Sequence, residues 1–303
     1  MNKKLQEYDI SVIKEMIRLI FDNFRTKKSQ HKIPKKTIHK ILFNVGKSLP
    51  EDNPVKSTIP FYWYLDGPFS ETIDHTIRQM KKEKIILLND GKYELYTYNT
   101  NLQHKRFFDH QENNFDKIRN VISSNVSGIG GFSNLYLVRD VYDDSPILFY
   151  PNYKAQFLTH FESYCKYRTT NNLDNHITEE SLILELGRSV LSIPLTPTFS
   201  DFKILFLKFE DVIKKTFEYK NKKNSKYAIA LKNLNGYSKE IWVTFAHGAR
   251  ILKHDSYYQD QIAKWEYEFL RKTETLNESM FTTIEIVEKN LEIQINSDYT
   301  QDK

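Results

Sequence analysis

Residues 59–71 read Ile59-Pro-Phe-Tyr-Trp-Tyr-Leu-Asp-Gly-Pro-Phe-Ser-Glu71, and a basic segment continues from there to Asn89-Asp-Gly91. The aromatic run is too apolar to lie in water, and the turn signal Asp-Gly-Pro closes it. Ser70 occupies the position of a helix N-cap, and Glu71 in the first turn is favoured by the helix dipole. The stretch therefore predicts a turn followed by a helix.

This helix is predicted to bury one face, because Ile73, Ile77, Met80 and Lys84 recur at helical spacing. Residues 85–88 and 92–98 then flank Asn-Asp-Gly, a sequence that supplies the positive φ of a tight hairpin turn. Apolar periodicity also predicts earlier helices at residues 9–24 and 34–45. Helix, turn, helix and hairpin is the order of a winged helix.

Composition and charge narrow the class of protein. Hydrophobic residues make up 40% of the chain, which is enough for packed cores, and the formal charge is +5. Residues 25–47 carry eight basic residues and no acid, whereas residues 274–303 carry seven acids and two lysines. A basic front suits a polyanionic partner, although a charged block is by default a solvated face.

The sequence lacks the features of disulfide-bonded, membrane-spanning and secreted proteins. Cys165 is the single cysteine, so an internal disulfide and a four-thiolate zinc site are excluded. No apolar run reaches the roughly 18 residues of a membrane span, and the amino terminus lacks the apolar core of a signal peptide. We expect a cytoplasmic protein without a membrane partner.

The predicted fold class is mainly α, with an amino-terminal winged helix followed by a mostly helical carboxy-terminal domain. The predicted divisions are a leading helix and basic linker at 1–30, the winged helix at 31–100, a helical domain at 101–296 and a frayed tail at 297–303. Within the helical domain, a short strand is predicted at 135–138 and a capping box at Thr198 and Asp201. Three apolar stripes, at 241–252, 258–269 and 280–291, predict three antiparallel helices.

A nucleic-acid interface is predicted on the helix after Ser70. Burial of its apolar stripe leaves polar residues outward, and Lys92 lies on the hairpin where a wing could touch a phosphate. The predicted contacts are Thr72, His75, Thr76, Arg78, Gln79, Lys81, Lys82 and Lys92, together with Lys35 and Lys36 from the preceding helix. Glu71 and Asp74 argue against duplex binding, because the amino-terminal part of such a helix normally meets the groove first.

The aromatic run admits two interpretations. Tyr62, Trp63 and Tyr64 could stack on bases, but aromatic residues beside a turn more often fill a core, which we favour. The pattern Phe-Tyr-Trp-Tyr-Leu-Asp-Gly-Pro-Phe-Ser resembles the Trp-Tyr-x-x-Gly-Pro-aromatic-Ser core of YwgA-like proteins, which look related to the Panacea domain of SocA-type antitoxins. The matching residues are Trp63, Tyr64, Gly67, Pro68 and Ser70.

The resemblance covers residues 32–98, and this part is also similar to winged helix-turn-helix regulators of the PadR and MarR kind. It implies a regulatory or antitoxin-like role, with binding of DNA or of a partner protein. It carries over no catalytic residue, because the motif is structural.

Enzyme and metal signatures mostly fail. The glycines at 128–131 fit neither phosphate-loop type. The acids and histidines at 104–112 lack a diagnostic metal spacing, as do His247 and His254 on one predicted helical face. Arg25 and His31 formally match the spacing of HEPN ribonucleases, but they lie in a lysine-rich linker. Cys165 is expected to be a small core residue. We expect no enzyme, no cofactor and no metal site.

The sequence thus favours a DNA-binding regulatory protein whose helical domain mediates dimerisation or partner contact, possible partners being a second copy or another protein. The alternative is an antitoxin- or defence-type module that uses the winged helix to bind a protein. A nuclease is a distant third.

Overall fold

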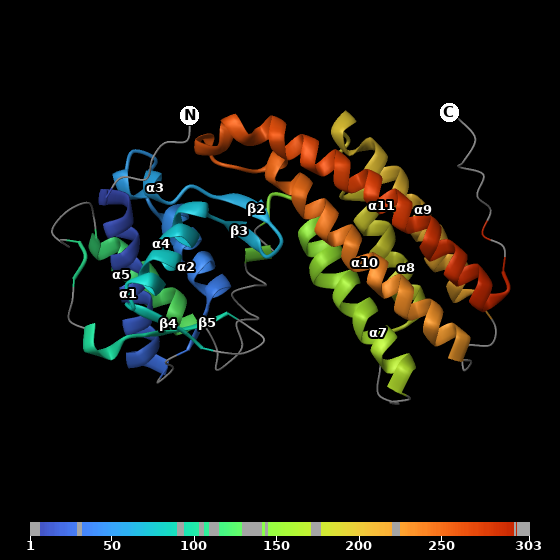
Figure 1. Ribbon diagram of the computed structural model, residues 1–303, viewed down its shortest axis with the longest axis horizontal. Helices are drawn as coiled ribbons and strands as arrows, with labels where there is room; N and C mark the ends of the chain where they lie inside the picture. Colours follow the sequence, from blue (N-terminus) through green and yellow to red (C-terminus); the bar gives the residue numbers. More distant parts are fainter. Residues whose placement is uncertain are drawn as a thin grey trace. The chain divides into compact units, whose positions relative to one another are not determined.

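The computed structural model describes residues 7–28, 32–89, 94–102, 106–108, 115–128, 141–142, 145–170, 177–219, 225–293 and 295. It is mainly α-helical, with small antiparallel sheets near the amino terminus, as Figure 1 shows. Contacts divide the chain into two compact units: unit 1 is Met1–Asp144 with Lys253–Asp260, and unit 2 is Ser145–Leu252 with Gln261–Lys303. Each unit is described by itself below.

Unit 1 begins with a long amphipathic helix, as the spacing of its apolar residues predicts. Its helices are α1 (Glu7–Lys28), α2 (Lys35–Ser48), α3 (Pro54–Thr58), α4 (Glu71–Lys82) and α5 (Phe115–Gly128), with a 3₁₀ turn η1 (Thr100–Leu102). Its strands are β1 (Ile33–Pro34), β2 (Tyr62–Tyr64), β3 (Gly67–Phe69), β4 (Ile86–Asn89) and β5 (Leu95–Tyr98).

Two small sheets form in unit 1. The first has the order β1-β5-β4, with Ile33 opposite Tyr96 and Leu88 opposite Tyr96 on the other side. The second is the hairpin β2–β3, in which Trp63 lies opposite Pro68. β4 and β5 are the hairpin predicted after α4, although the turn between them at residues 90–93 lies outside the described residues.

The loop Lys253–Asp260 extends the second sheet at its β2 edge. His254 pairs antiparallel with Tyr62. The Trp63 N–H donates to the Lys253 carbonyl at 3.0 Å, and the Asp255 N–H donates to the Phe61 carbonyl at 2.8 Å. The Asp255 carboxylate also accepts from the Phe61 N–H at 2.7 Å. The loop that joins the two longest helices of the chain is therefore built into unit 1.

The predicted domain boundary near residue 100 differs from this division. Phe115, Ile118, Ile122 and Val126 of α5 are fully or almost fully buried in one apolar cluster with α1, α2 and α4. A helix with such a stripe has to cover it, and the faces of α1 and α2 are where it does so. Unit 1 therefore extends well past residue 100 and includes α5.

Unit 2 is helical in its described part. A π-helix η2 (Tyr150–Phe157) runs into α7 (Leu158–Thr170), and α8 (Glu179–Leu191), a 3₁₀ turn η3 (Pro197–Phe199), α9 (Ser200–Phe217) and α10 (Ser225–Leu252) follow. After a further 3₁₀ turn η4 (Ser256–Gln261), α11 (Ile262–Leu291) packs along α10 (Figure 1). Aromatic rings from η2, α9, α10 and α11 form its core together with Phe149, which directly precedes η2. The ring centres of Phe149 and Phe245 lie 3.9 Å apart.

Three details of the predicted helical domain are corrected. The second and third stripes belong to one continuous helix, α11, and Tyr258 lies in unit 1. Thr198 does not cap α9, because its hydroxyl donates to Glu266 and the helix begins at Ser200.

Cys165 is buried, as predicted.

The predicted strand at 135–138 and the tail at 297–303 lie outside the described residues. Among the helices of the described segments, none combines the length and the apolarity that crossing a membrane requires.

Candidate functional site

The outward face of α4 is the surface that the sequence singles out. Ile73, Ile77 and Met80 are buried, as their spacing predicts. His75, Arg78, Lys81 and Lys82 are exposed, and Gln79 is half-buried. The helix therefore presents a polar stripe in which cations dominate from its second turn onward.

Two predicted contact residues do not lie on that stripe. Thr72 and Thr76 are buried, so their prediction as outward-facing side chains is wrong. The Thr72 hydroxyl donates to the Thr58 carbonyl at 3.1 Å, and the Thr76 hydroxyl donates to the Thr72 carbonyl at 2.8 Å. A hydroxyl whose hydrogen bond is made within the protein can be buried at little cost, so these two threonines can lie on the inner side of the helix.

Asp74 of α4 and Glu83 just past it are paired with cations. The Asp74 carboxylate forms ion pairs with Lys35 of α2 and, at 3.1 Å, with Arg78. Glu83, just past the helix, pairs with Lys14 of α1 at 2.7 Å and accepts from the Gln79 side chain at 2.8 Å. The pairs offset the negative charge of Asp74, whereas Glu71 is exposed, has no ion pair within the described residues and still argues against a polyanionic partner.

Three lysines at the end of α4 remain without such partners. Lys81, Lys82 and Lys84 are exposed, and within the described residues their ammonium groups have no hydrogen bond or ion pair. Lys84 has a φ of 57°, a left-handed conformation that ends the helix and leads the chain into β4. Its predicted place on the buried face of the helix is therefore wrong.

The amino-terminal turn of α4 is covered by the loop Lys253–Asp260. The Glu71 N–H donates to the Tyr258 hydroxyl at 3.2 Å, and this hydroxyl donates to the Pro60 carbonyl at 3.3 Å. Ser70 is at the N-cap position as predicted, but its hydroxyl contacts Thr72 instead of capping the helix. The end of α4 that would enter a groove first is thus already occupied.

Tyr62 and Trp63 of the aromatic run are buried, as predicted. Trp63 is 2% exposed and meets Phe43 edge-on at 6.3 Å, so it fills core. Gly67 has a φ of 93°, which L side chains rarely adopt, and it makes the turn between β2 and β3 possible. Pro68 is buried beside it, and Tyr64 is half-buried.

A buried lysine fixes this turn. Lys40 is 1% exposed. Its ammonium group donates to the Asp66 carbonyl at 2.6 Å and lies 4.9 Å from the centre of the Tyr142 ring. Burial lowers the pKa of Lys40 to about 8, although the Asp66 carboxylate partly opposes this shift. No pattern in the sequence predicts the burial of Lys40, since a lysine side chain normally lies in water.

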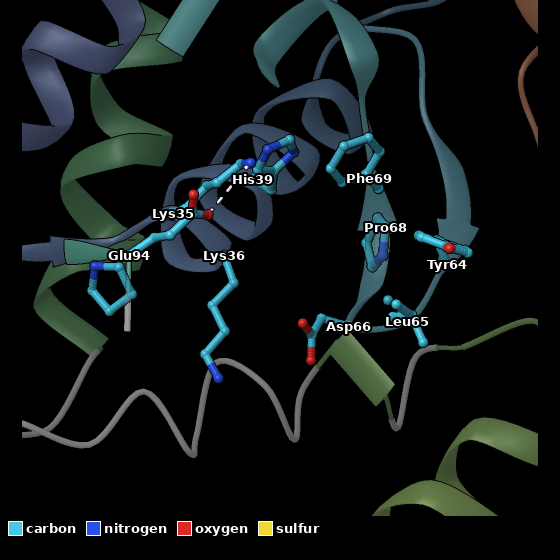
Figure 2. Close-up of a pocket in the computed structure, with 11 residues that line it drawn as sticks. Lys35, Lys36, His39, Tyr64, Leu65, Asp66, Pro68, Phe69 and Glu94 are labelled. Atoms are coloured by element: carbon cyan, nitrogen blue, oxygen red, sulfur yellow. Dashed lines mark ion pairs between the residues drawn. The ribbon is translucent and has the colours of Figure 1, made fainter. Parts of the chain in front are cut away.

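A cavity of about 470 Å³ opens next to this turn. It is lined by the start of α2 (Pro34, Lys35, Lys36, His39), by residues 64–69 and by Glu94. Figure 2 shows His39 and Phe69 facing each other at one end, with Lys36 and Asp66 toward the other. Lys35 is held by its ion pairs with Asp74 and, at 3.5 Å, Glu94, whereas Lys36 is exposed.

His39 is the unusual residue of this cavity. It is 3% exposed and stacks on Phe69 with ring centres 4.8 Å apart. Burial lowers the pKa of His39 to about 3, so the ring is neutral at pH 7. The Ser70 N–H donates to its Nδ1 at 3.4 Å, which leaves the proton on Nε2, and Nε2 has no hydrogen-bond partner within the described residues.

The remaining predicted contacts and metal ligands are dispersed. Lys92 lies outside the described residues, as do the acids and histidines of the 104–112 cluster, which are His104, Asp109, His110 and Glu112. His247 is on α10 beside Arg250, whereas His254 is in the loop that pairs with β2, so they do not share a helical face. In the segments that the structure describes, no group of acids, histidines or cysteines could hold a metal ion.

Comparisons with protein-family models, with curated protein sequences and with solved structures find no match to this chain.

Proposed function

We propose that unit 1 is a winged-helix module that binds duplex nucleic acid, with DNA as the preferred partner, through α4, and that the protein acts as a regulator. The observation that carries the proposal is the set of exposed cations Arg78, Lys81, Lys82 and Lys84 at the end of α4. Lysine and arginine side chains on one helix face neutralise phosphates and release the counterions condensed on a duplex.

The order of elements supports the same proposal. In a winged helix, a short strand between the first two helices pairs with the hairpin that follows the third. β1 lies between α1 and α2 and pairs with β5 of the hairpin that follows α4. This arrangement would make α4 the recognition helix and β4–β5 the wing.

An alternative is supported by a different observation. In a helix-turn-helix the two helices are joined by three or four residues, whereas residues 49–70 and the second sheet separate α2 from α4. The Tyr258 hydroxyl also covers the first turn of α4. A module whose groove-facing end is covered in this way suits docking to a protein, as in an antitoxin- or defence-type complex.

Charge reversal separates the two proposals. We expect Arg78→Glu with Lys82→Glu to abolish binding of a mixed-sequence duplex at low salt, because two phosphate contacts become repulsive. The matched control is Lys232→Glu with Arg271→Glu, which makes the same change of charge at exposed positions of unit 2. Fluorescence anisotropy of a labelled duplex measures both.

Equal affinities of the two double variants and of the parent protein would refute binding through α4. Loss of binding in both variants to the same extent would indicate a dependence on net charge alone, and this result would also contradict the proposal.

A further inference from the structure

We propose that the cavity beside the start of α2 is a binding site for a small organic acid with an apolar body. Its volume of about 470 Å³ lies within the range of small-molecule sites, about 300–1,000 Å³. This inference goes beyond nucleic-acid binding and does not depend on it, because every group that it uses lies in the cavity.

The inner end of the cavity is formed by the ring of His39. His39 is neutral and almost completely buried, and its Nδ1 accepts from the Ser70 N–H. The proton is therefore on Nε2, which has no partner within the described residues. Nε2 itself is buried, so the ring adds neither a charge nor a reachable donor to the cavity, and this end suits an apolar body.

The charges of the lining favour an anion over a cation. Lys35 is paired with Asp74 and Glu94. The negative charge of Asp66 is offset by the buried ammonium of Lys40 beneath the turn. Lys36 is then the lining cation that has no ion pair within the described residues, and its flexible stem lets the ammonium reach into the opening.

The apolar walls define the rest of the ligand. Phe69, Pro68 and Tyr64 line the side opposite α2, as Figure 2 shows. The Phe69 ring is already aligned by its stacking on His39. A flat or branched hydrocarbon body would lie against these side chains, with its carboxylate directed to Lys36.

Phenylacetate and phenylacetamide are matched probes, because they differ in the anionic group and share the apolar body. For a fragment of this size we expect phenylacetate to bind the full chain with a Kd on the order of 1 mM. Phenylacetamide should bind at least about fivefold more weakly, since one charge-assisted hydrogen bond is lost. NMR titration that follows the aromatic signals of His39 and Phe69 measures both affinities at the site.

Two variants assign the roles. Lys36→Gln, at an exposed position that the fold does not need, should weaken phenylacetate at least about fivefold and leave phenylacetamide unchanged. His39→Leu should weaken both probes, because it removes the ring on which the wall residue Phe69 is stacked. The control is Lys82→Gln, which removes the same charge from α4 and should change neither affinity.

Several results would overturn the proposal. These are absence of saturable binding up to about 10 mM, equal affinities of the two probes, or an unchanged phenylacetate affinity in Lys36→Gln. Inorganic phosphate that binds as tightly as phenylacetate and shifts the same signals would also contradict it, because the apolar walls would then contribute nothing.

Discussion

Truncation of Trp63 tests the core of unit 1. The side chain is 2% exposed, and it packs edge-on against Phe43 of α2. Trp63→Ala removes nearly all of a buried indole, which typically costs about 3–5 kcal/mol of unfolding free energy. Small domains are stable by about 5–15 kcal/mol, so this loss is a large fraction of the total. The backbone bond from Trp63 N–H to Lys253 is independent of the side chain.

Amide hydrogen exchange followed by mass spectrometry is the suitable assay, because peptides of α4 and α10 come from different units. We expect the opening free energy of α4 peptides to fall by about 3–5 kcal/mol in the variant. The matched control is Tyr267→Ala, which truncates an aromatic side chain that is 62% exposed and should change stability by less than about 0.5 kcal/mol. Normal protection of α4 in Trp63→Ala, together with lost duplex binding, would refute the core assignment and favour base stacking.

Two further predictions concern the turn beside the cavity. The pKa of Lys40 is 10.5 in its usual range and about 8 in the fold, so between these values the unfolded chain binds more protons and stability rises with pH. Lys40→Met should abolish this rise in urea unfolding between pH 8 and 10.5, and an unchanged slope would show that Lys40 is not its cause. Gly67→Ala should lower stability by about 1–3 kcal/mol, because φ is 93° and a Cβ would lie 3.3 Å from the Lys40 Nζ. A thermal midpoint equal to that of the parent protein would contradict the strain argument.

The spacing of apolar residues predicted which face of a helix is buried. The stripe of Ile73, Ile77 and Met80 gave the buried face of α4 correctly, since apolar spacing reports directly on a helix face. It failed at Thr72 and Thr76, because their hydroxyls bond to the carbonyls of Thr58 and Thr72 and can therefore be buried. A polar residue at the edge of a stripe is thus ambiguous from sequence alone.

The continuity of α11 is compatible with the sequence. Residues 253–303 contain no glycine or proline, so nothing in the sequence marks a break between the second and third apolar stripes. The stripes form the single helix α11. The polar residues between the stripes do not form a link, because polar residues also occur on the solvent side of a continuous helix.

Long-range features could not be predicted from a single sequence. The pairing of Tyr62 with His254 joins segments far apart in the chain, and neither segment carries a pattern that specifies the other. His39 and Lys40 follow Lys32, Lys35 and Lys36, in a basic stretch for which the composition predicts exposure to solvent. Their burial depends on the position of the β2–β3 turn against α2, which is a tertiary property.

The most direct test of the central claim is the salt dependence of duplex affinity for the parent protein and for Lys82→Gln. If α4 contacts phosphates, the logarithm of the binding constant falls linearly with the logarithm of salt concentration, and removal of one contact lowers the slope by about 0.9. We expect this reduction in Lys82→Gln and an unchanged slope in Lys232→Gln, which removes an exposed lysine of unit 2. Identical slopes for Lys82→Gln and the parent protein would contradict the assignment of α4 as the nucleic-acid-binding helix.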